Sequence, residues 1–247
     1  MGDIMLNKFL IIMTFSALSL FGCGGGGTTT PSSGTSNTPT DTSLVFSLFA
    51  PEYLGGSYSV PAFPLTGSDT NGDSYTATQS VQSGDPAEEI IVTVDYVAPV
   101  KVIDVDTLIT NTNTNAVITI ADNKYYTHEP AFTDIRYFGY TNSLGILATP
   151  TSEPSINIIP LTATIGNFGT VGHYTREDGS GFAQDWELAD GFNGKAILIV
   201  TTVPDDITTD TYPTTVEKFL ISQDGTVSGF ELIMTYHASN NTITLTN

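Results

Sequence analysis

The chain has 247 residues, of which 26 are acidic and only 7 are Lys or Arg, so its formal net charge is −19. This balance excludes nucleic acid as a partner, because binding it depends on Lys and Arg neutralising phosphates. Charged residues make up 13% of the sequence, and Thr, Ser and Asn take the place of the missing charges. The composition is typical of an exported β-protein with hydroxyl-rich outer faces, and it indicates no particular activity.

Residues 1–22 predict a secretory signal peptide. Lys8 supplies a basic start, and an apolar run follows from Phe9 to Phe21. The run is too short to cross a bilayer as a helix, which needs about 20 apolar residues. At its end, residues 20–23 (Leu-Phe-Gly-Cys) resemble the lipobox of bacterial lipoproteins, although the family has a small residue where Phe21 stands.

The lipobox resemblance implies that the signal peptide is cut before Cys23 and that this cysteine carries the lipid. Cys23 is the only cysteine in the sequence, so the chain forms no internal disulfide and no thiolate metal cluster. We therefore expect a protein of the bacterial cell envelope, anchored to the outer membrane through its N-terminal lipid. Residues 23–43 then form the lipidated cysteine and a tether of Gly, Ser, Thr and Pro that cannot build a core.

Strand patterns dominate the remaining sequence and predict an antiparallel all-β fold. Residues 90–96 alternate apolar and polar side chains, residues 230–236 repeat this pattern, and residues 196–203 are apolar on both faces. Residue pairs that favour two-residue hairpin turns separate such runs. These pairs are Asn71-Gly72, Asn193-Gly194, Asp224-Gly225 and Asn240-Asn241.

The body divides at a proline-rich stretch into an N-terminal β region, residues 44–149, and a C-terminal β meander, residues 150–247. Pro150, Pro154 and Pro160 lie in this stretch, and proline interrupts the pairing of strands. The length suits one large β domain or two small ones. The meander, of about six strands, predicts either a half-open barrel or one layer of a sandwich.

Parts of the C-terminal region resemble the tail of uncharacterised β-rich lipoproteins from Gram-negative bacteria. The resemblance rests on residues 160–174 (PLTATIGNFGTVGHY), 185–188 (DWEL) and 221–230 (ISQDGTVSGF). Because the shared positions are turns and core residues, the resemblance implies the fold and supplies no function.

A weak calcium-site candidate lies at Asp69, Asn71 and Asp73, whose side-chain oxygens occupy positions 1, 3 and 5 of a calcium loop. However, Ser74 stands where that loop needs Gly, and Ser80 stands where it needs a bidentate Glu. A polar turn between two strands is the favoured interpretation. We accordingly expect no bound metal or other cofactor.

An aromatic cluster in residues 124–140 is the candidate binding patch. Clustered Tyr with Arg is typical of surfaces that bind proteins or sugars, because these side chains combine a large contact area with a polar end. The favoured alternative is that the rings alternate into the sheet core, and we expect a mixture with Tyr126 or Tyr137 near the rim. The residues concerned are Tyr125, Tyr126, Phe132, Arg136, Tyr137 and Tyr140.

No catalytic motif occurs in the sequence. The pair His128-Glu129 begins like a zinc-protease helix, but Phe132 stands where the second histidine should be. We therefore expect a non-catalytic binding or accessory role, with an envelope protein or a glycan as partner. The alternative is an envelope hydrolase that uses scattered acidic residues.

Overall fold

The computed structural model describes residues 44–49, 58–83, 88–93, 96–127, 134–151 and 158–247. These residues all belong to one compact unit, Thr42–Asn247. The predicted signal peptide, Cys23 and the predicted tether lie outside the described residues. Within the described ranges, no helix is long and apolar enough to span a bilayer.

Strands account for most of the described residues. Their bounds are β1 Val45–Ser47, β2 Tyr58–Asp69, β3 Ser74–Ser83, β4 Glu88–Thr93, β5 Tyr96–Asn111, β6 Val117–Thr127, β7 Asp134–Asn142, β8 Leu147–Pro150, β9 Ile158–Pro160, β10 Thr162–Thr164, β11 Phe168–Arg176, β12 Gly181–Asp190, β13 Ala196–Pro204, β14 Thr214–Ile221, β15 Val227–Tyr236 and β16 Asn241–Thr246.

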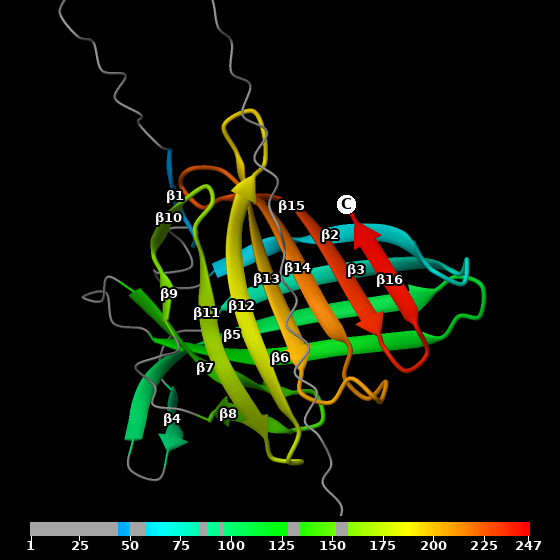
Figure 1. Cartoon of the computed structure of the whole chain (residues 1–247), viewed down its shortest axis with the longest axis horizontal. Helices are drawn as coiled ribbons and strands as arrows, with labels where there is room; N and C mark the ends of the chain where they lie inside the picture. Colours follow the sequence, from blue (N-terminus) through cyan, green and yellow to red (C-terminus); the bar gives the residue numbers. More distant parts are fainter. Residues whose placement is uncertain (1–43, 50–57, 84–87, 94–95, 128–133, 152–157) are drawn as a thin grey trace, which may run out of the picture. The chain divides into compact units, whose positions relative to one another are not determined.

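Twelve of these strands form a single antiparallel sheet that closes on itself (Figure 1). The order is β3-β2-β16-β15-β14-β13-β12-β11-β8-β7-β6-β5, and β5 pairs back with β3. Most neighbours are consecutive in the chain, as in an up-and-down meander, and the ring closes where the last strand, β16, pairs with β2. The predicted all-β antiparallel meander is therefore confirmed, and its sheet is fully closed.

The two predicted regions on either side of residue 149 share this sheet. Two short strands, β8 and β9, pair with different parts of β7: Tyr140 lies opposite Ala148, and Ile135 lies opposite Ile159. Because proline cannot donate a hydrogen bond to a ladder, the proline-rich stretch interrupts one strand of the common sheet. It does not separate two sheets.

The pleat of the strands places apolar side chains inside the ring and hydroxyl groups outside it. In β16, Ile243 and Leu245 are buried, and the threonine after each of them is exposed. In β3, Tyr75 and Ala77 are likewise buried and followed by exposed threonines. The register of the ladder is thus set by one buried face, since a slip of one residue would reverse the two faces.

The interior holds two hydrophobic clusters. One is built on β7, β8 and β11–β14, with Tyr174 and Phe182 at its centre, and β1 adds Phe46 to it. The other is built on β2, β3, β5, β15 and β16. Phe219 of β14 packs against both clusters. The space that the two clusters leave is the candidate site.

Candidate ligand-binding cavity

Two adjoining cavities lie inside the closed sheet, with volumes of about 310 Å³ and about 150 Å³. Five side chains line both cavities, and they come from five different strands; we call them the shared polar layer. The larger volume falls at the lower end of the range for small-molecule sites, about 300–1,000 Å³. The five residues are Gln79, Lys124, Tyr137, Gln184 and Glu217.

The smaller cavity is mainly apolar and aromatic beyond the shared polar layer. Trp186 of β12, the only tryptophan in the sequence, is one of its walls and is 8% exposed. Leu48 and Phe49, which follow β1, form another part of the wall. Phe63, Val200 and Phe219 are among the side chains that the sheet itself adds to this lining. An apolar group is the natural occupant, because burying it removes hydrocarbon from water.

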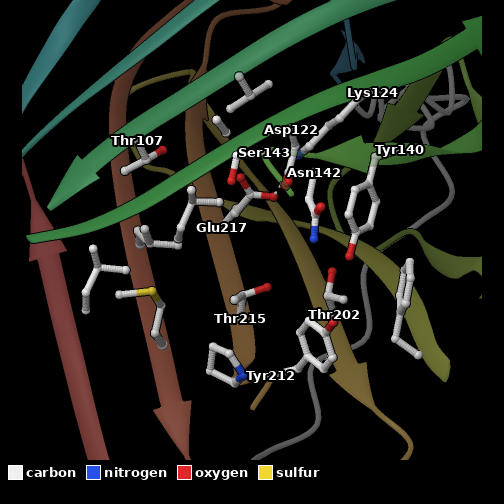
Figure 2. A pocket seen from close by; sticks show the side chains of 18 of the residues that line it. Thr107, Asp122, Lys124, Tyr140, Asn142, Ser143, Thr202, Tyr212, Thr215 and Glu217 are labelled. Atoms are coloured by element: carbon white, nitrogen blue, oxygen red, sulfur yellow. Dashed lines mark hydrogen bonds and ion pairs between the residues drawn. The ribbon is translucent and has the colours of Figure 1, made fainter. Parts of the chain in front are cut away.

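The larger cavity is lined by many hydrogen-bonding groups and also by apolar side chains, among them Leu232, Met234 and Ile120. Figure 2 shows that the Asn142 amide and the Tyr140 hydroxyl converge on the same space as Thr202. This arrangement suits a polar group that both donates and accepts hydrogen bonds.

A buried ion pair crosses the interior within the shared polar layer. The Lys124 Nζ lies 3.5 Å from the Glu217 Oε2, and the two side chains are 18% and 15% exposed. Their strands, β6 and β14, lie on opposite sides of the ring, with five strands between them along either path. Burial alone would lower the pKa of Lys124, but the carboxylate of Glu217, together with Tyr126 and Asp122, raises that pKa above its ordinary value. Lys124 is therefore charged at neutral pH and holds the two walls together.

Asp122 faces the larger cavity without a hydrogen-bond donor in the described part of the chain. It lies two residues before Lys124 in β6, on the same face of the strand. Burial raises the pKa of Asp122; the charge of Lys124 opposes this effect and that of Glu217 adds to it. A carboxylate removed from water without donors costs free energy, so this group is available to bind a ligand.

Three other groups of the shared polar layer have hydrogen-bonding capacity to spare. The amide groups of Gln79 and Gln184 donate to Thr107 and Thr202 over 3.4 and 3.1 Å, and among the described residues no donor reaches their carbonyl oxygens. The hydroxyl of Tyr137, whose residue is 2% exposed, also lacks a partner among them. Since buried polar groups are normally hydrogen-bonded, these atoms indicate that a ligand or water occupies the cavities.

Arg176 lies at the edge of the larger cavity but is already committed to protein groups. Its Nε donates to the Tyr140 hydroxyl over 2.8 Å, and its guanidinium lies 3.8 Å from the centre of the Tyr212 ring. The Tyr212 hydroxyl in turn donates to Asp178 over 2.7 Å. Hydrogen bonds from Ser180 and Tyr212 lower the pKa of Asp178 to about 2. Through these contacts Arg176 fixes this part of the cavity wall.

The loop between β13 and β14 forms part of the wall of the larger cavity through Tyr212 and its neighbours. Its first part is held by the Asp205 carboxylate, which lies 2.9 Å from the His173 Nε2. Further on, the Asp210 carboxylate accepts the backbone amides of Ala238 and Ser239 over 2.9 and 3.3 Å. These contacts fix the loop to neighbouring turns, so the cavity has a defined wall on this side.

The calcium-site candidate is a polar turn in the structure. The Asp69 carboxylate accepts hydrogen bonds from the backbone amides of Asn71 and Asp73, at 3.0 and 2.9 Å, and from Tyr75 and Asn241. Asp73 is also occupied, by side-chain amides of the β5–β6 turn. Among the described residues, no three His, Cys, Asp or Glu side chains form a group that could hold a metal.

The aromatic residues predicted as a surface patch are divided between the two faces of the sheet. Tyr126, Tyr137 and Tyr140 line the cavities, whereas Tyr125 packs with Phe138 in a separate small cluster. Tyr137 and Tyr125 are 2% and 8% exposed, so these two rings follow the favoured alternative of core-facing aromatics and do not form an exposed patch. The alternation of the strands explains this result, because it sends successive side chains to opposite faces.

Two members of the predicted patch cannot be placed. Phe132 and the side chain of Arg136 lie outside the described part of the structure. The described members that face the interior nevertheless belong to a site, since they line the cavities together with the shared polar layer.

Sequence reasoning missed the centre of the site, because Lys124 and Glu217 are 93 residues apart. A local signal was present in both strands. Asp122 and Lys124 occupy the face that Ile118 and Ile120 use, and Glu217 shares its face of β14 with Phe219. Charged residues at core-facing positions contradict the usual pattern and therefore mark a functional site.

No family model matches this chain, and no significant match was found among curated proteins or solved structures.

Asp122 makes the stability of the protein depend on pH. Because its pKa is raised, the folded protein holds this proton more tightly than the unfolded chain does. The charged group thus costs stability above the folded pKa, and the cost disappears as the pH falls below 3.8. We expect Asp122→Asn to raise the free energy of unfolding by about 1 kcal/mol at pH 7, with no gain at pH 3.

Urea denaturation at the two pH values measures this difference. Asp106→Asn is the matched control, because Asp106 is an exposed acid on the neighbouring strand β5. An equal gain in both variants at pH 7, or a loss in Asp122→Asn, would show that Asp122 is not a strained buried carboxylate.

Proposed function

We propose that this protein is a lipid-anchored lipoprotein of the bacterial outer membrane that binds a small amphipathic molecule inside its closed sheet, without catalysis. The observation that carries the binding role is the shared polar layer. Buried hydrogen-bonding groups without partners in the described chain face two cavities, one mainly apolar and the other partly polar. An amphipathic ligand matches this arrangement because each part of it meets the environment that it prefers.

In the proposed complex, the apolar part of the ligand lies between Trp186, Phe219 and Val200. Its polar part lies at the shared polar layer, where Tyr137 donates a hydrogen bond and the glutamines accept. Burial raises the pKa of the Tyr137 hydroxyl far above its ordinary value, and nearby tyrosines add to the effect, so this group stays a donor. Each CH₂ buried in the smaller cavity contributes about 0.8 kcal/mol, which is roughly a fourfold gain in affinity.

The lipid anchor is the part of the proposal supported by sequence alone. It rests on the signal-peptide pattern and on Cys23 as the single cysteine. A ligand-binding role suits such an anchor, because a tethered domain samples molecules that enter or leave the envelope. An envelope protein or a glycan is the macromolecular partner that the sequence predicts for the outer face.

An envelope hydrolase is the second candidate, and one observation favours it. Asp122 and Glu217 both face the larger cavity, and burial raises the pKa of Asp122, as in a general acid. Binding is the better supported role, because Glu217 is held in an ion pair with Lys124. Release of sugars from purified peptidoglycan, lost in Asp122→Asn, would favour the hydrolase.

Straight-chain alcohols test the binding role. Thermal denaturation of the protein without its first 23 residues, in the presence of butan-1-ol to decan-1-ol, should show a melting temperature that rises with chain length. The rise should stop once the chain fills the cavity. A steady lowering of the melting temperature by every alcohol would contradict a preformed interior site.

Replacing Cys23 by Ser tests the anchor. We expect the Ser variant to lose fatty-acid labelling and to move from the membrane fraction to the soluble fraction or to an unprocessed precursor, because the lipid supplies the attachment. The measurement is fractionation of cells after labelling with a radioactive fatty acid. Labelling that persists in Cys23→Ser would overturn the assignment.

A further inference from the structure

We propose that one end of the closed sheet docks on the bilayer that holds the lipid anchor, with Phe168 and Phe192 in contact with zwitterionic lipid. The inference rests on the proposed anchor and adds a second, non-covalent contact with the membrane. It follows from where the exposed apolar side chains lie and from where the predicted tether joins the body.

Exposed apolar side chains gather at this end of the sheet. Ten large apolar side chains are exposed in the described part of the chain, and five of them come from the start of β1, the β10–β11 turn, the start of β11 and the β12–β13 turn. Figure 1 shows β1, β10 and the β12–β13 turn at its upper end. Phe168 and Phe192 are the most exposed of the five, at 79% and 73%. We call the five residues the apolar end: Leu44, Val45, Ile165, Phe168 and Phe192.

Strand pairing brings these segments together. Val45 lies opposite Thr164, at the beginning of the β10–β11 turn. In that turn, the backbone amide of Gly166 donates to the carbonyl oxygen of Leu188 in β12 over 2.7 Å. Phe168 is paired with β12 as well, and the β12–β13 turn follows directly. Segments far apart in the sequence thus present apolar groups on one surface, and such surfaces mark contacts with a partner.

Phe192 has a backbone conformation that aromatic residues seldom adopt. Its φ is 62°, and Asn193 and Gly194, the next two residues of the turn, have φ of 52° and 76°. Asn and Gly accept positive φ readily, so either residue would suit this position better than Phe if the turn alone mattered. Strained residues cluster at functional sites, and the exposed ring at this position therefore indicates contact with another surface.

The predicted tether selects the bilayer as the partner. Leu44 belongs to the apolar end, and residues 24–43 separate it from Cys23. A flexible chain of this length reaches roughly 25 Å, so the anchor keeps the apolar end near the lipid. Tethering turns docking into an intramolecular step, and a few apolar side chains then suffice for contact. Aromatic rings favour the interface between lipid and water.

The acidity of the chain selects a bilayer without net charge. Asp190 precedes the β12–β13 turn and accepts the backbone amide of Phe192 over 2.9 Å. Asp224 accepts that of Thr226 over 3.0 Å in the β14–β15 turn, which is hydrogen-bonded to β1. Lys195 adds one positive charge, but the whole sequence carries −19. Anionic lipid would repel these carboxylates, whereas zwitterionic headgroups would not.

Quenching by brominated lipid tests the contact in the protein purified from cells and reconstituted into phosphatidylcholine vesicles, with and without bromine on the acyl chains. Phe192→Trp places a reporter at the apolar end, and Ile207→Trp places one in the β13–β14 loop, where the residue is 48% exposed. We expect bromine to remove about half or more of the fluorescence that Phe192→Trp adds to that of Trp186, and none of what Ile207→Trp adds. Phe168→Ser should weaken the quenching of Phe192→Trp about twofold, because it removes apolar area from the contact. Leu144→Ser is the matched control, since Leu144 is 81% exposed in the β7–β8 turn, and it should leave the quenching unchanged.

Flotation of the vesicles tests the anchor separately, and an unchanged melting temperature in detergent shows that the variants are folded. If the protein does not float with the vesicles, the anchor is overturned and the docking with it. If it floats but bromine quenches Phe192→Trp no more than Ile207→Trp, the docking is overturned and the anchor stands. Blue-shifted emission of Phe192→Trp without quenching, together with a dimer after crosslinking, would assign the apolar end to a second copy of the chain and overturn the contact with lipid.

Discussion

Replacing Lys124 by Met is expected to lower the free energy of unfolding by about 3 kcal/mol or more. The substitution leaves the Glu217 carboxylate, which is 15% exposed, without the ammonium that lies 3.5 Å away. Breaking a buried pair on one side costs more than the pair itself contributes, because the remaining charge has lost its water as well as its partner. Asp122 would lose the same neighbouring charge, which lowers its pKa in the intact protein. Urea denaturation at pH 7 measures the loss.

Two further variants separate this explanation from a general effect of removing lysine. Lys218 directly follows Glu217 in β14 and points to the outer face. It pairs with Glu231 at 2.9 Å, and the two side chains are 31% and 33% exposed. Because exposed ion pairs contribute little, Lys218→Met should cost less than about 1 kcal/mol. The double variant Lys124→Met, Glu217→Leu should recover most of the loss. Equal losses in the two single variants would contradict the account of a buried pair.

Adding one methyl group at Gly67 is expected to cost about 2–3 kcal/mol, because β2 and β16 come too close there for a side chain. Gly67 lies opposite Leu245, and a Cβ built on it would collide with the carbonyl oxygen of Thr244. The backbone of β16 cannot turn away without losing its pairing with β2, which closes the ring. Gly67→Ala should therefore lower the urea midpoint of the whole protein.

Ser68→Ala is the control for Gly67→Ala. Ser68 is the next residue in β2 and is exposed on the outer face, so we expect its loss to change stability by less than about 0.5 kcal/mol. A Gly67→Ala variant as stable as Ser68→Ala would show that the seam between β2 and β16 is looser than the structure indicates.

The strands and turns of the C-terminal half follow from local sequence signals. The predicted run 196–203 lies within β13, and the run 230–236 lies within β15. The turns at Asn193 and Asn240 have positive φ, as the residue pairs predicted. Apolar alternation and turn chemistry act over a few residues, so they can be recognised without the fold.

Elements that depend on distant contacts were not predictable in the same way. The alternation over residues 90–96 covers parts of two strands, β4 and β5, that pair with each other. Strand β11 carries no local strand signal, because its sequence FGTVGHYTR contains glycines and polar residues that give no clear period. Closure of the ring depends on β16 meeting β2, which is more than 170 residues away in the sequence. No local pattern encodes that contact.

The candidate site, too, was predictable only where local sequence signals mark it. The aromatic residues of 124–140 were recognised as candidates, but only the closed sheet reveals that Tyr126, Tyr137 and Tyr140 face a cavity. The partner of Lys124 comes from the other side of the ring, so the shared polar layer exists only in the folded protein.

The central claim is that a ligand enters the interior, and quenching of Trp186 tests it most directly. As the only tryptophan, 8% exposed and lining the smaller cavity, Trp186 reports on the occupancy of that space. We predict saturable quenching of its fluorescence by 6-bromohexan-1-ol, whose bromine would lie beside the ring. Val200→Phe places a larger side chain in the cavity and should weaken the quenching. Ile199→Phe changes the preceding residue, which points to the opposite face of β13, and should not weaken it. Quenching that rises linearly without saturation, equally in both variants, would contradict an interior binding site.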